Sequence, residues 1–119
     1  MSWMLVALGC AQGPTVAGTP ERVAPLCAPW TERQLPSLAG GAVVFCDARR
    51  LTVEFPTGRA DALGPTWRLA VRTGGWAEDV DSSAPGLVNV RYLQGSRRLD
   101  LSLIDATDHT LVILTEIGE

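Results

Sequence analysis

The side chains with the most reactive chemistry in this sequence are three cysteines, Cys10, Cys27 and Cys46, and a single histidine, His109. Because three is an odd number, at most two of the cysteines can pair with each other within one chain. A metal site would require closely spaced ligands such as Cys-x-x-Cys, and the sequence has neither that spacing nor a second histidine. We therefore expect no metal and no cofactor.

Cys10 ends an apolar run that begins at Trp3, and small and turn-forming residues follow it over 11–20. This arrangement is typical of the end of a bacterial lipoprotein export signal, in which the cysteine is lipidated and becomes the new N-terminus. No basic residue precedes Cys10, since the first is Arg22. The competing interpretation is an apolar strand or a frayed terminus. We predict an export signal over 1–10, lipidation at Cys10 and no transmembrane span, which would need about 20 apolar residues.

The compartment decides the chemistry of Cys27 and Cys46. In an oxidising compartment they would form a disulfide across Trp30, which contributes about 3 kcal/mol in the chain-entropy model. In the cytosol they would be two buried thiols, because free cysteine is often part of a core. We expect the disulfide, on the condition that the chain is exported.

Two pairs of arginines flank predicted hairpin turns, Arg49 with Arg50 and Arg97 with Arg98. If both turns lie at one end of a sheet, the four guanidinium groups would gather an anionic ligand or a lipid headgroup. The competing interpretation is solvated charge that discourages edge-to-edge pairing of strands. Tryptophans add a second candidate, a ligand groove lined by Trp30 and Trp76, against the simpler interpretation that both are core aromatics.

Catalysis has weak support, and we expect a protein that is not an enzyme. His109 lies in a predicted turn, and neither Ser96 nor Ser102 has the surroundings of an activated nucleophile. Asp79 and Asp81 have the alternate spacing of calcium ligands. The glycine and the bidentate glutamate that a calcium loop requires are missing, so we interpret this acidic stretch as a solvated loop.

Composition limits the classes of partner. The chain has 119 residues, a length suited to one domain, and its net charge is −3 with a pI near 5.1. Its ten basic residues are all arginine and are scattered, so no basic surface for nucleic acid is expected.

Proline divides the chain, because five of its eight prolines fall before residue 41 and proline resists helices and central strands. We interpret 11–25 as a flexible tether and 26–119 as a single α+β domain that begins with an irregular arm over 26–41. Apolar runs over 42–46 and 51–55 predict a hairpin.

Residues 60–73 predict a helix with Leu63, Trp67, Ala70 and Val71 on one face, ended by two glycines at 74 and 75. Pro65 offers a second start for this helix, since proline is tolerated at the first helical position.

Residues 78–86 are interpreted as an acidic loop. Strands over 87–93, 98–104 and 110–117 then form an antiparallel meander, because the connections between them are short. The predicted order is β-β-α-β-β-β, mainly antiparallel sheet with one helix packed on one face. We also expect the last strand to be an exposed edge able to pair with another chain.

A helix that contains Trp67, then Gly75 and Trp76, then strands that include the stretch from Gly95 to Leu103 form a series along the chain. Over Leu35 to Ile117 this series resembles small bacterial lipoprotein domains of uncharacterised function. The resemblance implies an envelope-exposed domain without known catalysis.

These observations predict an exported or membrane-tethered envelope domain with a binding or scaffolding role, whose partner would be an envelope protein or a lipid surface. The alternative is a cytosolic interaction or regulatory module, similar to an immunity protein, in which the cysteines stay reduced. The sequence does not specify the oligomeric state.

Overall fold

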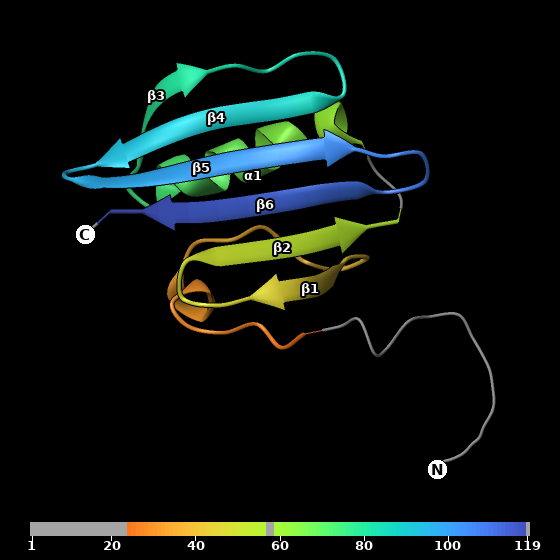
Figure 1. The fold of residues 1–119 in the computed structure, drawn as a ribbon, viewed down its shortest axis with the longest axis horizontal. Helices are drawn as coiled ribbons and strands as arrows, with labels where there is room; N and C mark the ends of the chain where they lie inside the picture. Colours follow the sequence, from red (N-terminus) through yellow and green to blue (C-terminus); the bar gives the residue numbers. More distant parts are fainter. Residues whose placement is uncertain (1–23, 57–58, 119) are drawn as a thin grey trace, which may run out of the picture.

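A six-stranded antiparallel sheet is the main element of the computed structural model, which describes residues 24–56 and 59–118. The strands are β1 (Ala42–Cys46), β2 (Arg50–Phe55), β3 (Ala77–Asp81), β4 (Leu87–Gln94), β5 (Arg97–Asp105) and β6 (Thr110–Ile117). Their order across the sheet is β1-β2-β6-β5-β4-β3 (Figure 1). One helix, α1 (Ala60–Thr73), packs on one face, so the predicted α+β fold class is confirmed.

Alternation along the strands gives the sheet two different faces, because successive side chains point to opposite sides. The face toward α1 carries the buried residues of the four longest strands, β2, β4, β5 and β6. Among them, Tyr92 in β4 is fully buried. The opposite face is solvated and carries five large apolar side chains that are each more than a third exposed: Phe45, Val80, Leu93, Ile104 and Ile117. One covered face and one wet face are typical of an antiparallel sheet with a single helix.

Helix α1 has the bounds that the sequence predicts, and it ends at two glycines, of which Gly75 has a φ of +95°. Its buried side is formed by Ala60, Gly64, Trp67 and Val71. The alternative start at Pro65 is wrong, because the helix begins at Ala60 and Pro65 lies inside it. The earlier start is stabilised from outside the helix, since the backbone N–H of Ala60 donates to Asp105 Oδ1 at 2.8 Å.

Two other predictions need correction. The acidic stretch predicted as a loop over 78–86 begins with a strand, β3, which pairs with β4 from Ala77↔Leu93 to Asp81↔Val90. The final strand is not an edge, because β6 lies between β2 and β5. The β6–β2 pairing joins residues about 60 positions apart, such as Arg50 and Thr115, and hairpin signals report only on strands that are neighbours in sequence. The edge strands are β1 and β3.

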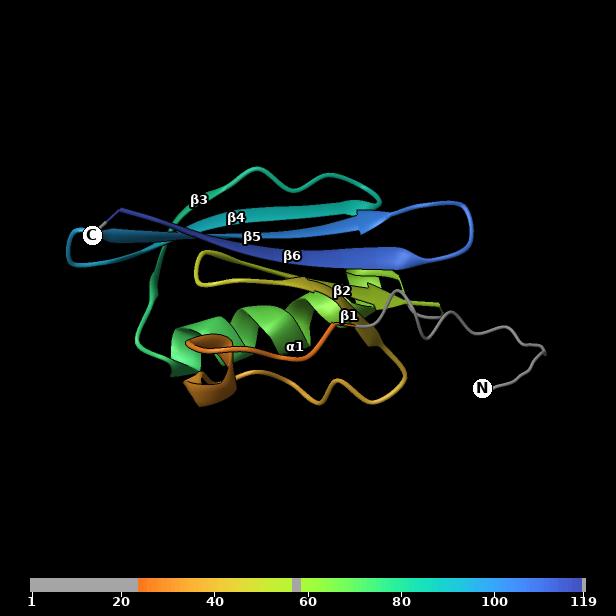
Figure 2. The same cartoon turned by 60° about the horizontal axis from the view of Figure 1, so that its bottom comes forward.

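Residues 24–41 form an irregular arm that contains one short 3-10 helix, η2 (Trp30–Glu32). Figure 2 shows this arm and α1 on the same side of the sheet. Trp30 is buried, and Leu26, Leu35 and Leu38 pack against the core beside it. The predicted export signal, Cys10 and residues 11–23 of the predicted tether lie outside the described residues; the first described residue, Ala24, donates its N–H to Val43 O at 2.6 Å.

Candidate functional site

A pocket of about 380 Å³ lies where the arm, the C-terminal end of α1 and one end of the sheet meet. Its lining includes both tryptophans of the predicted groove, Trp30 and Trp76, together with two arginines, Arg33 and Arg97. Besides the two indoles, the apolar part of the lining comes from five side chains: Leu35, Ala70, Val71, Leu99 and Leu114. We call this hollow the Arg33–Arg97 pocket.

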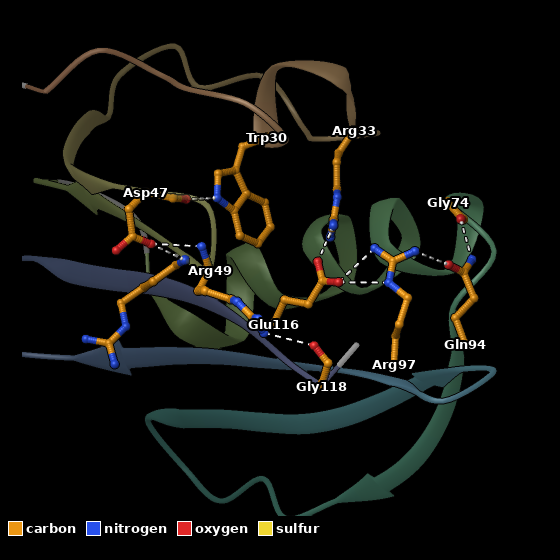
Figure 3. Close-up of polar contacts among 10 residues, drawn as sticks. Trp30, Arg33, Asp47, Arg49, Gly74, Gln94, Arg97, Glu116 and Gly118 are labelled. Carbon is orange, nitrogen blue, oxygen red and sulfur yellow. Dashed lines mark hydrogen bonds and ion pairs between the residues drawn. The ribbon is translucent and has the colours of Figure 1, made fainter.

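The arm that forms one wall of the pocket is fastened to the β1–β2 hairpin. Cys27 in the arm and Cys46 at the end of β1 are paired at disulfide distance, with Cα atoms 6.0 Å apart, so the predicted pair is confirmed. Beside this link, the indole Nε1 of Trp30 donates to Asp47 O at 2.7 Å (Figure 3). The Asp47 carboxylate shapes the turn itself, because Oδ1 accepts the backbone N–H groups of Arg49 and Arg50, both at 2.8 Å.

A carboxylate held by two guanidinium groups joins the arm to the centre of the sheet. Glu116 Oε1 accepts from Arg33 Nη2, and Glu116 Oε2 accepts from Arg97 Nε at 2.8 Å and lies 2.8 Å from Arg97 Nη2. Figure 3 shows the Glu116 carboxylate between the two arginines. Burial of this carboxyl would raise its pKa, but the hydrogen bonds and positive charges of Arg33 and Arg97 outweigh burial and lower the pKa of Glu116.

Both guanidinium groups also lie over indole rings. Arg33 is 4.7 Å from the ring centre of Trp30 and 5.6 Å from that of Trp76, while Arg97 is 5.1 Å from Trp76. The two tryptophans are only 1% and 6% exposed. A cation over an aromatic face is attracted by the ring quadrupole, so this stacking orients the arginines as well as covering the rings.

Gln94 connects the pocket to the end of α1. Arg97 Nη1 donates to Gln94 Oε1 at 3.2 Å, and Gln94 Nε2 donates to Gly74 O at 3.2 Å. A side chain at Gly75 would place its Cβ only 2.8 Å from Gln94 Nε2 on a left-handed backbone. The glycines that end the helix therefore also leave room for this contact.

The four arginines of the predicted anion site lie at one end of the sheet but do not come together. Both hairpin turns are at this end, since Arg50 pairs with Thr115 and Arg98 with Ile117. Arg97 points into the pocket, whereas Arg98 lies on the opposite face and binds Asp100 through contacts of 3.0 and 2.8 Å. The two arginines of the β1–β2 turn also lie apart from the pocket. Arg49 Nη1 donates to Gly118 O at 2.9 Å, and Arg50 occupies an outward position of β2.

The weaker candidates for chemistry are dispersed. His109 lies in the β5–β6 turn, at the end of the sheet opposite Ser96, and its Nδ1 is 2.7 Å from Asp108 Oδ1. Ser102 on the uncovered face contacts Asn89. The acidic residues of β3 form ion pairs instead of one cluster: Asp79 with Arg91, and Glu78 and Asp81 with Arg68.

Sequence reasoning missed Arg33 and Glu116. For Glu116 a signal exists, because it falls at the inward positions of its strand together with Val112 and Leu114, and a buried carboxylate requires a cationic partner. The alternation of β5 likewise distinguishes the two arginines: Arg97 lies on the same face as buried Leu99, and Arg98 lies on the opposite face. Arg33 lies in the irregular arm, where no periodicity indicates which way a side chain points.

No protein-family model, no curated protein and no solved structure matches this chain. Within residues 24–56 and 59–118, no helix combines the length and apolar character that crossing a bilayer requires. Across the same described ranges, histidine, cysteine, aspartate and glutamate side chains form no group of three or more that would hold a metal ion.

Proposed function

We propose that this chain is a non-enzymatic binding domain of the cell envelope, exported and tethered to the membrane through Cys10, with its ligand site in the Arg33–Arg97 pocket. The Cys27–Cys46 pair is the observation that carries this proposal. Disulfides persist in oxidising compartments and are rare in the reducing cytosol, so the pair favours an exported protein.

The position of the pair also supports a binding role. Apart from η2, the arm has no regular structure of its own, yet it supplies Trp30, Arg33 and Leu35 to the pocket. A covalent link at Cys27, three residues before Trp30, holds this wall in place at a lower entropic cost to ligand binding. A pocket formed by rigid helices and strands alone would not need such a link to hold its walls.

The lining of the pocket favours binding over catalysis. The described residues that line it include no histidine, cysteine or serine, and the hydroxyl of Thr73 already donates to Leu69 O at 2.8 Å. Nucleophilic catalysis pairs a nucleophile with a base within hydrogen-bond reach, and Glu32 is the only carboxylate among the described lining residues, so the lining offers no such pair. The volume of about 380 Å³ is in the range of small-molecule sites, about 300–1,000 Å³.

Alkylation and fractionation of bacterial cells that make the full chain would test this proposal. We expect Cys27 and Cys46 to react with a thiol reagent only after reduction, and the protein to sediment with membranes. The Cys10→Ser variant should lose membrane association and keep the disulfide, which makes it the matched control. Soluble cytosolic protein in which both thiols react without reduction would overturn the proposal and favour the cytosolic interaction module.

A further inference from the structure

We propose that the Arg33–Arg97 pocket binds a single carboxylate attached to an apolar body, the chemistry shared by the C-terminal residue of a peptide and a free arylalkanoic acid. This inference rests on the proposed binding role of the pocket and assigns the class of ligand.

The two guanidinium groups of the pocket have more N–H donors than their bonds within the described chain use. A guanidinium group has five N–H donors, and Arg97 uses Nε and Nη2 toward Glu116 and one N–H of Nη1 toward Gln94. The remaining N–H groups of Arg97 have no acceptor among the residues that the structure describes. Arg33 Nη1 is buried and likewise lacks a hydrogen-bond partner within the described chain. The Arg97 side chain is 38% exposed, so its remaining N–H groups are the donors that the acceptor oxygens of a ligand can reach.

The charges around the pocket select a monoanion. Arg33 and Arg97 together carry two positive charges, and Glu116 neutralises one of them. Glu32, an exposed residue of the lining, adds a second negative charge, which disfavours a dianion such as phosphate. One carboxylate can share the two guanidinium groups with Glu116, whereas a second negative charge is repelled by both glutamates.

The rest of the lining requires an apolar body on the ligand. Leu35, Val71, Leu99 and Leu114 come from four different elements and face the same hollow as the two indoles. Apolar walls with a few converging polar groups are the usual composition of small-molecule sites. The partly desolvated surroundings also strengthen each contact between a guanidinium and a carboxylate.

Calorimetric titration of the intact, oxidised protein would test this assignment with three probes. N-acetyl-L-phenylalanine represents a peptide C-terminus, 3-phenylpropionate represents a free acid, and N-acetyl-L-phenylalaninamide has the same body without the charge. We expect at least one acid to bind about tenfold or more tightly than the amide, the difference that one charge-assisted hydrogen bond supplies. Binding by the acetylated acid alone indicates a peptide C-terminus, and binding by phenylpropionate indicates that a free acid suffices.

Two neighbouring arginines provide a matched pair of variants. Arg97 and Arg98 are each 38% exposed and each is bonded to a carboxylate, but only Arg97 lines the pocket. Arg97→Gln should weaken binding of the acid about tenfold, and Arg98→Gln should leave it unchanged. The comparison of acid with amide uses the wild-type protein, so it remains decisive if Arg97→Gln does not fold.

Equal binding of acid and amide would overturn the assignment and leave the binding role of the pocket in place. Absence of binding by all three probes to folded protein would overturn it as well. Free thiols in cells, together with normal binding of the acid, would instead contradict the proposed location and support the ligand class. The two proposals can therefore fail separately.

Discussion

Glu116 shows how one residue at an unusual strand position connects separate parts of the molecule. It lies at an inward position of β6, where its side chain is only 11% exposed, and an unpaired carboxylate there would be strongly unfavourable. Arg33 reaches it from the arm and Arg97 from β5. Truncation of one partner in such a group leaves the others unsatisfied, so the three residues should behave as a unit.

Acid should weaken the fold through Glu116. Because its pKa is lowered in the folded state, the stabilisation from its charge is present above the unfolded pKa of about 4.3 and is lost as the pH falls through the lower folded value. We expect Glu116→Gln to lose about 1–3 kcal/mol of unfolding free energy at pH 7 and to converge on the wild type in acid. Denaturant unfolding between pH 7 and pH 3 measures both.

Glu32→Gln is the control for this pH series, because Glu32 is exposed and forms no ion pair with another residue that the structure describes. Its unfolding free energy should follow the wild type at every pH. A Glu116→Gln variant that stays below the wild type by a constant amount down to pH 3 would contradict an electrostatic origin for the difference.

At the scale of elements, the first residue of α1 is determined by a turn far along the chain. Asp105 at the end of β5 accepts the Ala60 N–H and the Thr110 hydroxyl, both at 2.8 Å, and its second oxygen lies 3.5 Å from Arg59. The hydrogen bond from Ala60 and then that from Thr110 lower the pKa of Asp105. A carboxylate at a helix N-terminus satisfies a free N–H and interacts favourably with the helix dipole. No residue next to Ala60 in sequence supplies this side-chain cap.

Removal of this carboxylate should shorten the helix from its beginning. We expect Asp105→Ala to lower the melting temperature and to speed hydrogen exchange in the first turn of α1, before Pro65, while the last turn exchanges as before. The matched control is Asp108→Ala in the same β5–β6 turn, because the Asp108 side chain is 85% exposed and its polar contact among the described residues is with the neighbouring His109. Unchanged exchange at Ala62 and Leu63, which follow the capped end, would contradict this role for Asp105.

At the scale of the whole molecule, a single sheet separates a covered face from an open one. Helix α1 packs over β4 and β5, and the arm lies beside it on the same side (Figure 2). The arm is joined to the sheet by the disulfide, the Trp30–Asp47 hydrogen bond and the Arg33–Glu116 ion pair. These links show how a chain with one helix still covers one face of most of the sheet, while the edge strand β3 stays exposed along its length.

Neighbouring residues of β5 test this division. Leu103 is fully buried under α1, whereas Ile104 is 40% exposed on the open face. We expect Leu103→Ala to lower the unfolding free energy by about 2–5 kcal/mol and Ile104→Ala to change it by less than about 1 kcal/mol. Urea unfolding of the two variants measures the difference. Similar losses from both would show that the open face is covered in solution.

Local pattern predicted α1 and every strand of the sheet except β3, but only part of the site. Alternation and turn residues predicted the two hairpin strands at 42–46 and 51–55, the helix at 60–73 and the three strands of the final meander. Assignment of Cys10 to an export signal left Cys27 and Cys46 as the predicted pair, and the aromatic residues suggested that Trp30 and Trp76 line one groove. These features depend on near neighbours along the chain or on residue chemistry that is independent of the fold.

The tertiary structure alone decided which distant residues meet. It placed β6 between β2 and β5, and it brought Arg33 and Arg97 to the same carboxylate. It also separated Arg97 from Arg98, although the two are adjacent in sequence. Each of these outcomes joins groups between 19 and 83 residues apart or sends neighbours to opposite faces. Their free energy comes from contacts that form only when the sheet closes, so no local pattern records them.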